Sequence, residues 1–190
     1  MAMPGTYTAT LSKVVDGEVT DFGEPMSFDV VPLREGTLEG ADFDEMASFQ
    51  NEVIAFQQDL TSFDNRVDNH IDMIKAMMMA LSRADQVDTE LEKSLYDTHM
   101  ELLDIKEKLD GSEAKGEVGV KNPPTPNDRM FVGMRAMLTS LYGPTDMHKQ
   151  MVEIGKSEFS AMEGDLTDIA DRFTQFRSRL EMLGAPPIQD

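Results

Sequence analysis

The fold is decided by residues 46–81, MASFQNEVIAFQQDLTSFDNRVDNHIDMIKAMMMAL. Eleven positions in this stretch follow one another at alternating steps of three and four, and ten of the eleven are apolar. This spacing keeps the side chains on one side of a slightly underwound helix, where only nearly parallel helices can bury them. The stretch therefore predicts a long helix in a helical bundle. The stripe consists of Met46, Phe49, Val53, Phe56, Leu60, Phe63, Val67, His70, Ile74, Met77 and Leu81.

Three further apolar stripes predict the other helices of the bundle. Asp88 can cap a second helix, which stops at Gly111. Asn127 can cap a third, shorter helix, and Thr145 a last one, whose stripe drifts around Glu158 as a stutter does. We expect a mainly α protein with an antiparallel bundle of about four helices, two of them long. The predicted helices span about 42–83, 88–110, 127–142 and 145–183. The stripes are Val87, Leu91, Leu95, Thr98, Leu102, Ile105 and Leu109, then Met130, Met134, Met137, Leu138 and Leu141, and finally Met147, Met151, Ile154, Met162, Leu166, Ile169, Phe173, Phe176, Leu180 and Leu183.

One long irregular segment, 111–126, separates the second predicted helix from the third. Its glycines and prolines interrupt regular structure. A stretch of this length serves as a crossing linker, a binding loop or a mobile flap, and we favour the linker. Two glycines in the last helix, Gly155 and Gly164, either let a neighbouring element approach closely or are tolerated weak points.

The first 34 residues predict a β-hairpin. Apolar and polar residues alternate over 7–12, the period of a half-buried strand. Asp16-Gly17 supplies the positive-φ pair of a two-residue turn, and Gly and Pro interrupt the return strand around 23–25. A lone hairpin is only marginally stable in water, so these strands need a partner sheet or must lie on the bundle. We interpret 1–34 as the closing strand pair of a sandwich whose earlier strands lie outside this chain, followed by a helical domain, 35–190.

The composition excludes several classes of partner. The chain has 36 acidic and 17 basic residues and a formal charge of −19, which repels phosphate backbones and anionic membranes. We therefore predict no nucleic-acid partner. No apolar run is long enough to cross a bilayer, which predicts no membrane insertion. The absence of cysteine excludes disulfides and cysteine-ligated zinc. Residues 1–5 lack a signal-peptide pattern, so we expect either a cytoplasmic protein or an excised piece of a longer one.

The sequence carries no recognisable catalytic or metal-binding constellation. None of the three histidines stands three residues after a glutamate, as in di-iron bundle sites, and no His-x-x-x-His pair exists. Asp64, Asp68 and Asp72 share a helix face but lack the loop glycine of a calcium-binding hand, and we interpret them as a solvated acidic face. No serine occupies a nucleophile elbow. We predict no catalytic residue, no cofactor, no metal and no enzymatic activity in this chain; an enzyme site in the 111–126 loop is the alternative.

Five residues remain as candidate interaction or switch positions: His70, Met77, Met78, Met134 and Met137. His70 is the polar member of the first stripe. Burial lowers the pKa of a histidine, so protonation of a buried His70 would strain the bundle and act as a pH switch. The interpretation that we favour is that His70 sits at the rim or is satisfied by a neighbouring carboxylate. The methionines can form a pliable binding groove, although core filling is the interpretation we favour.

Short motifs recur in a recognisable order along nearly the whole chain. They are PGTYTATL at 4–11, FDV at 28–30, LDG at 109–111, NDRM at 127–130, PT at 144–145 and GAP at 184–186. This order resembles the C-terminal region of bacterial sortilin-like, glycosyl-hydrolase-related β-propeller proteins with Asp-box (BNR) repeats. The resemblance implies an immunoglobulin-like sandwich closed before a helical tail, and a periplasmic or extracellular location. The supposed hydrolase sites of that family lie in the propeller, and no Asp-box is present here, so no family site residue carries over.

We therefore expect a non-catalytic C-terminal module of a larger exported protein, acting as a spacer or docking surface. The expected partners are upstream domains of the same polypeptide, with a separate protein partner or a homodimer as further options. The alternative is a free-standing helical adaptor or chaperone-like protein that binds a partner helix through its Met-rich apolar seam.

Overall fold

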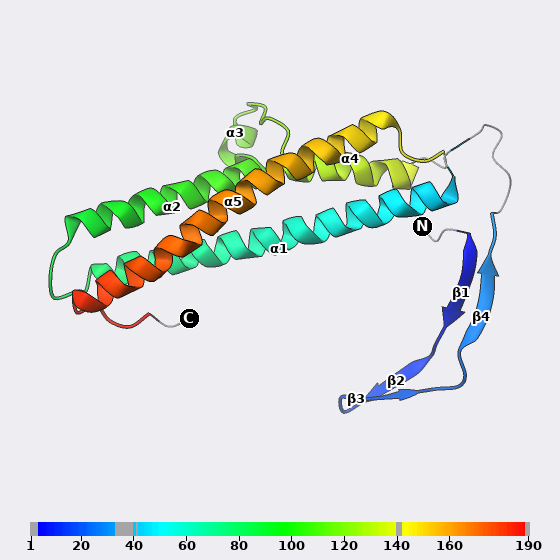
Figure 1. The fold of residues 1–190 in the computed structure, drawn as a ribbon, viewed down its shortest axis with the longest axis horizontal. Coiled ribbons are helices and arrows are strands. Elements are labelled where there is room, and N and C mark those ends of the chain that lie inside the picture. The colour runs from blue at the N-terminus through cyan, green and yellow to red at the C-terminus, as the bar shows by residue number, and fades with distance from the viewer. Residues whose placement is uncertain (1–3, 33–39, 41, 140–141, 189–190) are drawn as a thin grey trace.

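The structure is a computed structural model that describes residues 4–32, 40, 42–139 and 142–188 of the 190-residue chain. It is mainly helical, with two small antiparallel strand pairs before the helices (Figure 1), which confirms the predicted fold class. The elements are β1 (Gly5–Ala9), β2 (Ser12–Val15), β3 (Glu18–Asp21), β4 (Met26–Val30), α1 (Phe43–Leu81), α2 (Thr89–Asp110), α3 (Glu113–Glu117), α4 (Pro126–Thr139) and α5 (Asp146–Met182).

The four strands form one long ribbon that turns at Asp16-Gly17. β1 pairs with β4 and β2 with β3, both antiparallel. Asp16 and Gly17 have φ angles of 53° and 84°, the pair that a tight two-residue turn requires, so the predicted hairpin is confirmed. Residues 22–25 separate β3 from β4, whereas only residues 10–11 separate β1 from β2. The return strand therefore carries the extra residues, at the interruption that the sequence predicts.

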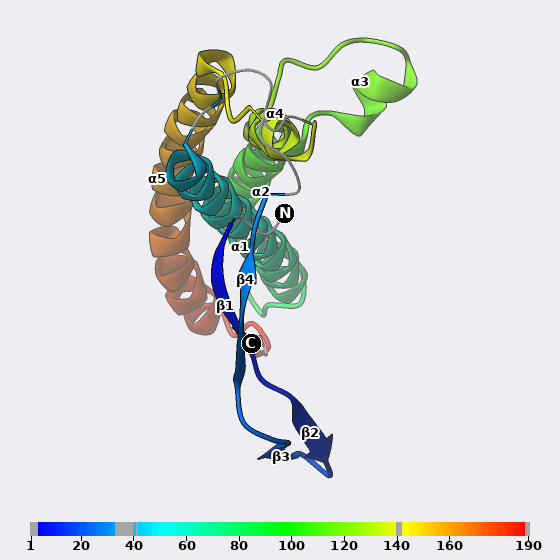
Figure 2. The same ribbon diagram turned by 90° about the vertical axis from the view of Figure 1, so that its right-hand side faces the viewer.

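The helices pack around one continuous apolar core. α2 and α4 follow one another along the length of α1, and α5 covers both of them (Figures 1 and 2). A cross-section through the bundle therefore contains three helices, namely α1, α5 and either α2 or α4. The shorter α4 takes the place of α2 beyond the end of α2. The predicted linker is not wholly irregular, because it contains the short helix α3, for which Ser112 accepts a capping hydrogen bond from the Lys115 amide.

The buried stripe of α1 departs from the predicted one at its centre. From Met46 to Val67 the predicted positions are all buried. The next buried residue is Ile71 rather than His70, because a second consecutive step of four turns the apolar isoleucine inward and leaves the histidine half-buried at the rim. At the end of the stripe Ala80 is buried, while Leu81 lies only partly covered.

The buried stripe of α5 is more regular than predicted. The expected stutter at Glu158 is wrong, because the buried positions run without interruption at alternating steps of three and four. The pattern was obscured by Gly155, which is a member of the stripe although it carries no side chain. A Cβ atom there would lie 3.1 Å from the Arg129 Cβ and 3.2 Å from the Phe56 ring, so the glycine permits a close approach. The stripe is Val152, Gly155, Phe159, Met162, Leu166, Ile169, Phe173, Phe176 and Leu180.

Three predicted stripe members are exposed: Val87 by 89%, Leu138 by 66% and Met147 by 53%. Each lies at or near the end of a helix, where no facing helix covers the position. Leu141, also predicted in the third stripe, lies outside the described residues, as do most of residues 35–41 that link the ribbon to α1. Gly164 faces open space, so it is a tolerated weak point rather than a packing position.

Candidate functional site

The strand pair β1–β4 of the ribbon has one apolar and one polar face. Because alternate residues of a strand point to opposite faces, the β1–β4 register gathers its apolar side chains on one side. Tyr7 and Phe28 face each other across the pair, with ring centroids 6.1 Å apart. We call this side the ribbon face. It consists of Tyr7, Ala9, Met26, Phe28 and Val30.

The opposite side of the same strand pair is adapted to water. The Thr6 hydroxyl donates to Asp29 Oδ1 at 2.7 Å, and the hydroxyls of Thr8 and Ser27 lie 3.3 Å apart. Cross-strand polar pairs of this kind stabilise an exposed surface. The ribbon is therefore amphipathic in the way expected of a sheet that covers something on one side.

Nothing in the described part of the chain covers the ribbon face. No strand contacts a helix there, and the ribbon extends away from the bundle (Figures 1 and 2). Met26 is 74% exposed and Phe28 51% exposed. At the turn end of the ribbon, Val14 and Val19 form a second apolar pair that is exposed to a similar degree. Exposed apolar surface of this continuity makes the ribbon face a candidate interaction site.

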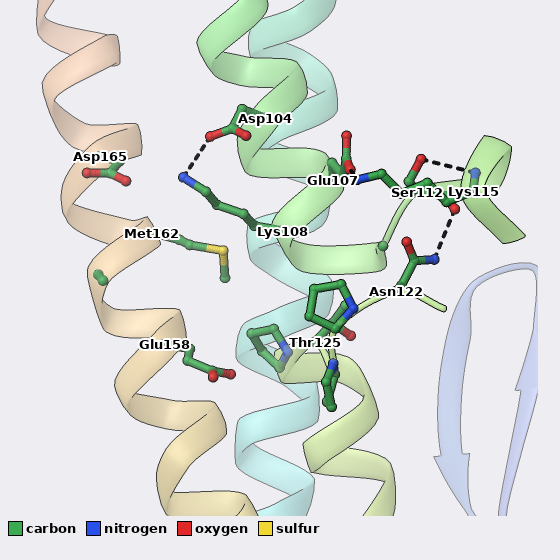
Figure 3. A pocket seen from close by; sticks show the side chains of 15 residues that line it. Asp104, Glu107, Lys108, Ser112, Lys115, Asn122, Thr125, Glu158, Met162 and Asp165 are labelled. Carbon is green, nitrogen blue, oxygen red and sulfur yellow. Dashed lines mark hydrogen bonds and ion pairs between the residues drawn. The ribbon is translucent and has the colours of Figure 1, made fainter. Parts of the chain in front are cut away.

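An open cleft of about 480 Å³ lies between the end of α2, the loop that follows α3, and the middle of α5 (Figure 3). Three prolines and the buried Met162 give it apolar walls, and charged side chains stand at its rim. The loop is held at both ends: Asn122 donates to the Ser112 carbonyl at 3.0 Å, and Asn127 donates to the Leu109 carbonyl at 3.2 Å. Residues 111–126 thus cross from α2 to α4 by a fixed path.

The charges around the cleft are largely compensated within the protein. Lys108 pairs with Asp104 at 2.6 Å and Lys115 with Glu107 at 2.6 Å. The hydrogen bond that Lys108 donates to Asp104 raises the pKa of Lys108. Glu158 Oε2 accepts from the Arg129 Nε at 2.8 Å, and its other oxygen accepts from the same guanidinium at 3.0 Å. The cleft is therefore a shallow apolar hollow with paired charges, and its lining residues include no histidine.

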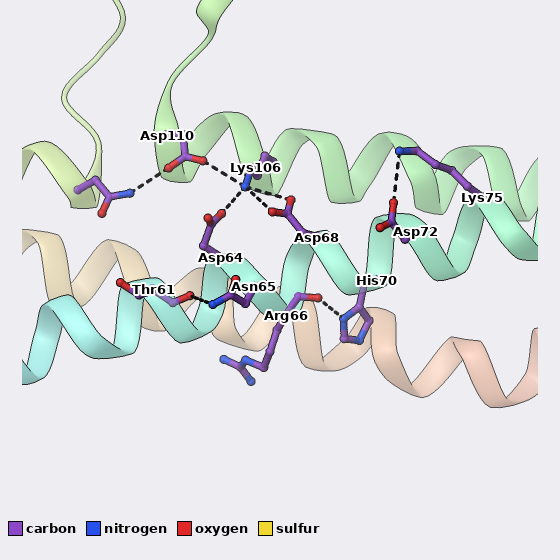
Figure 4. A network of polar contacts seen from close by, with 11 residues as sticks. Thr61, Asp64, Asn65, Arg66, Asp68, His70, Asp72, Lys75, Lys106 and Asp110 are labelled. Atoms are coloured by element: carbon purple, nitrogen blue, oxygen red, sulfur yellow. Dashed lines mark hydrogen bonds and ion pairs between the residues drawn. The ribbon is translucent and has the colours of Figure 1, made fainter. Parts of the chain in front are cut away.

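Lys106 of α2 pairs with three carboxylates, two on α1 and one on α2 itself (Figure 4). Its ammonium pairs with Asp64, with Asp68 at 3.0 Å and with Asp110 at 3.4 Å. Burial of the ammonium, the largest single influence, lowers its pKa, but the hydrogen bonds with Asp64 and Asp68 and the carboxylate charges together outweigh it and raise the pKa. Asp68 and Asp72 are exposed, as the interpretation of a solvated acidic face predicts, and Asp64 is half-buried; Asp64 and Asp68 in addition pair with a lysine of the neighbouring helix. The described residues contain no cluster of three or more histidine, aspartate or glutamate side chains arranged to hold a metal ion.

His70 lies beside the core rather than in it. Its Nδ1 is 2.6 Å from the Arg66 carbonyl oxygen, one turn earlier in α1, and its ring centroid is 5.2 Å from that of Phe173. A hydrogen bond to the backbone therefore satisfies this ring nitrogen. The role of His70 as a pH switch stays a prediction.

The four candidate methionines all contribute to the core. Met77 is fully buried, while Met78, Met134 and Met137 are partly buried and pack against the core from its edge. Their position agrees with core filling. The sequence singled out these buried residues, whereas the exposed residues that stand out in the structure belong to the ribbon face, whose alternating pattern was visible but was assigned only to fold.

None of the helices in the described ranges combines the length and the apolar character needed to cross a membrane. Comparisons with known proteins found no matching family model, no similar curated protein and no similar solved structure.

Proposed function

We propose that this chain is a non-catalytic C-terminal structural and interaction module of a larger exported protein of the sortilin-like, glycosyl-hydrolase-related propeller class. In this proposal the ribbon completes a β-sandwich with strands of the same polypeptide, and the bundle acts as a rigid spacer or docking surface. The periplasmic or extracellular location follows from the same family resemblance.

The observation that carries the proposal is the exposure of the ribbon face. Two strands alone are marginally stable in water, and three or more strands or a covering layer are needed for independent stability. A face built from Tyr7, Met26, Phe28 and Val30 fits the inner surface of a sandwich, where alternate residues of two sheets interdigitate. The polar face, with its Thr6–Asp29 hydrogen bond, fits the outer surface of the same sandwich.

The length of the bundle is consistent with a spacer function. At 1.5 Å per residue, the 39 residues of α1 span about 58 Å. Ion pairs join the helices near both ends and near the middle of the bundle: Arg179 with Asp88 at 2.7 Å, Lys149 with Glu45 at 2.5 Å, and Arg66 with Glu163 at 3.1 Å. A rod tied in this way transmits a distance and an orientation with little internal bending.

The alternative function, an adaptor that binds a partner helix through the Met-rich seam, requires the bundle to open. The seam is covered by α2, α4 and α5, and Met77 within it is fully buried. A partner helix would have to displace one of these helices. We therefore favour the module, in which the interacting surface is already exposed.

The proposal is tested in the longer polypeptide that it requires. The gene should continue upstream of the Met1 codon into sandwich strands and propeller repeats; an authentic start codon at Met1 would contradict it. In the longer protein, Phe28→Asp should lower the melting temperature of the sandwich, because it places a charge on the ribbon face. The matched control is Ser27→Asp on the polar face, which should change little. Equal effects of the two substitutions would contradict the proposal that the ribbon face packs inside the sandwich.

The non-catalytic part of the proposal has its own test. The purified chain, incubated with a panel of glycan substrates, should release no product. Turnover that persists through purification and is lost on heat unfolding of the bundle would contradict it.

A further inference from the structure

One exposed face of α1 carries no charged residue, although the chain as a whole carries −19. Helical spacing places this face opposite the buried stripe, over about five turns. Across an equal length, α5 exposes five carboxylates between Glu153 and Asp171. We call the uncharged surface the amide face. Its exposed members are Asn51, Ile54, Gln58, Thr61, Ser62, Asn65 and Asn69.

The charged residues of the same stretch lie on the flanks of α1. Glu52 pairs with Lys156 at 2.6 Å, and Arg66 pairs with Glu163 at 3.1 Å, both on the side of α5. Asp59 falls midway between Glu52 and Arg66 at heptad spacing, and therefore lies on that flank too. On the other flank Asp64 and Asp68 turn to Lys106 (Figure 4). The outward surface is left to amides, hydroxyls and one isoleucine.

The chemistry of the amide face makes it complementary to itself. An amide side chain carries both donors and acceptors, whereas a carboxylate only accepts, so two amide surfaces can hydrogen-bond where two acidic surfaces repel. Thr61 donates to the Gln57 carbonyl at 2.9 Å and Asn65 to the Thr61 carbonyl at 3.0 Å, which fixes their orientation on the helix. The face is hollowed: these side chains, with Gln58, Ser62 and Asn69, line a shallow open depression, and its lining on the side of α5 also includes Arg66, which pairs with Glu163.

We infer that the amide face binds a second copy of this chain, through a two-fold pairing of α1 with α1. A two-fold interface brings the same patch of both subunits together, so it requires a self-complementary surface. Like charges juxtaposed across an interface are costly, and the acidic surface of α5 carries that cost. The amide face avoids it and also brings Ile54, 38% exposed, into the contact. This inference concerns a different surface from the ribbon face and does not depend on the proposed function.

The first test is the mass of the full chain in solution, by light scattering at rising protein concentration. We expect a monomer–dimer equilibrium. Added salt should tighten the dimer, because it screens the repulsion between two chains of charge −19 while the interface itself contains no ion pair. A strictly monomeric chain, or a dimer that salt weakens, would overturn the inference.

The second test adds charge to the face. The double variant Gln58→Glu/Asn65→Glu introduces four carboxylates into the dimer and should weaken it about tenfold or more. The matched control Ser160→Glu/Gln175→Glu adds the same charge at exposed positions of α5 and should change the dimer little. Circular dichroism checks that both variants keep their helices. Equal weakening by both pairs would contradict the assignment, and Phe28→Asp on the ribbon should leave the dimer intact.

Discussion

The ribbon and the bundle carry apolar side chains at equally regular spacing, yet only the bundle buries them. Val53, Phe63 and Ile74 on α1 are completely buried, whereas Met26 on the ribbon is 74% exposed. Periodicity dictates which side of an element is apolar, but burial requires a second layer in the same molecule. The helices supply that layer for one another. The two-stranded ribbon has none among the described residues, so its apolar face stays exposed while the helices form a closed unit.

The largest difference between the two regions is expected when the same Phe→Ala truncation is made in each of them. Phe63→Ala should reduce the free energy of unfolding by about 3 to 5 kcal/mol, because it removes a fully buried ring that meets Phe159 at 5.2 Å. Phe28→Ala in the ribbon should change it by less than about 0.5 kcal/mol in this chain. Urea denaturation followed by helical circular dichroism measures both. A comparable loss from Phe28→Ala would mean that the ribbon is part of the cooperative fold.

Alanine substitutions at two helical glycines should have smaller effects, which depend on how closely the helices pack around each glycine. A Cβ atom on Gly133 would lie 2.5 Å from Val152 Cγ2, so Gly133→Ala should destabilise the protein by about 1 to 3 kcal/mol. Gly164→Ala, at a helical position with open space around it, should stabilise by about 1 kcal/mol. Thermal melting of the two variants compares them directly. Stabilisation by both substitutions would show that helix propensity, rather than close approach, governs both positions.

The ion pairs of Lys106 predict that the stability of the helical bundle depends on pH. Its pKa is raised in the folded protein, so its contribution to stability is present in full below 10.5, the value of an unfolded lysine, and is lost as the pH rises through the folded value. Lys93, Lys108 and Lys149 have raised pKa values and act in the same direction. The urea concentration at the midpoint of unfolding should therefore decrease as the pH rises above 10.5. The decrease should be less steep in the Lys106→Met variant. An identical slope in that variant would exclude Lys106 as a source of the dependence.

The smallest effect is expected from removing the ribbon altogether. Deletion of residues 1–32 should leave the unfolding free energy of the helices within about 0.5 kcal/mol of the full chain, because no strand contacts a helix in the described residues. Calorimetry of both proteins provides the measurement. A clear drop in melting temperature would indicate that the bundle depends on the ribbon.

Most of the fold could be predicted from the sequence, because long stripes and turn residues act locally. The Asp16-Gly17 turn and the interruption at residues 23–25 were recognisable from backbone preferences alone. The predicted stutter in α5 failed for the opposite reason: Gly155 has no side chain to register in a hydrophobic pattern, and its buried position depends on Phe56 of another helix. His70 was likewise assigned to a stripe that the neighbouring Ile71 occupies.

The candidate surfaces were less predictable than the elements that carry them. The alternation that forms the ribbon face is visible in the sequence, but its exposure depends on what the rest of the chain fails to cover. The pairing of Asp64 and Asp68 with Lys106 joins residues about 40 positions apart, which no local pattern contains. The amide face becomes evident only when the buried stripe and the two ion-paired flanks of α1 are assigned.

Amide hydrogen exchange across the full chain tests the central contrast most directly. The amides of α1 and α5 should exchange only through global unfolding, whereas those of β1 and β4 should exchange several orders of magnitude faster, because a two-stranded ribbon without a covering layer opens readily. In the longer polypeptide that we propose, the ribbon amides should become protected while those of the bundle stay unchanged. Ribbon amides that are protected to the level of α1 in this chain alone would contradict the account.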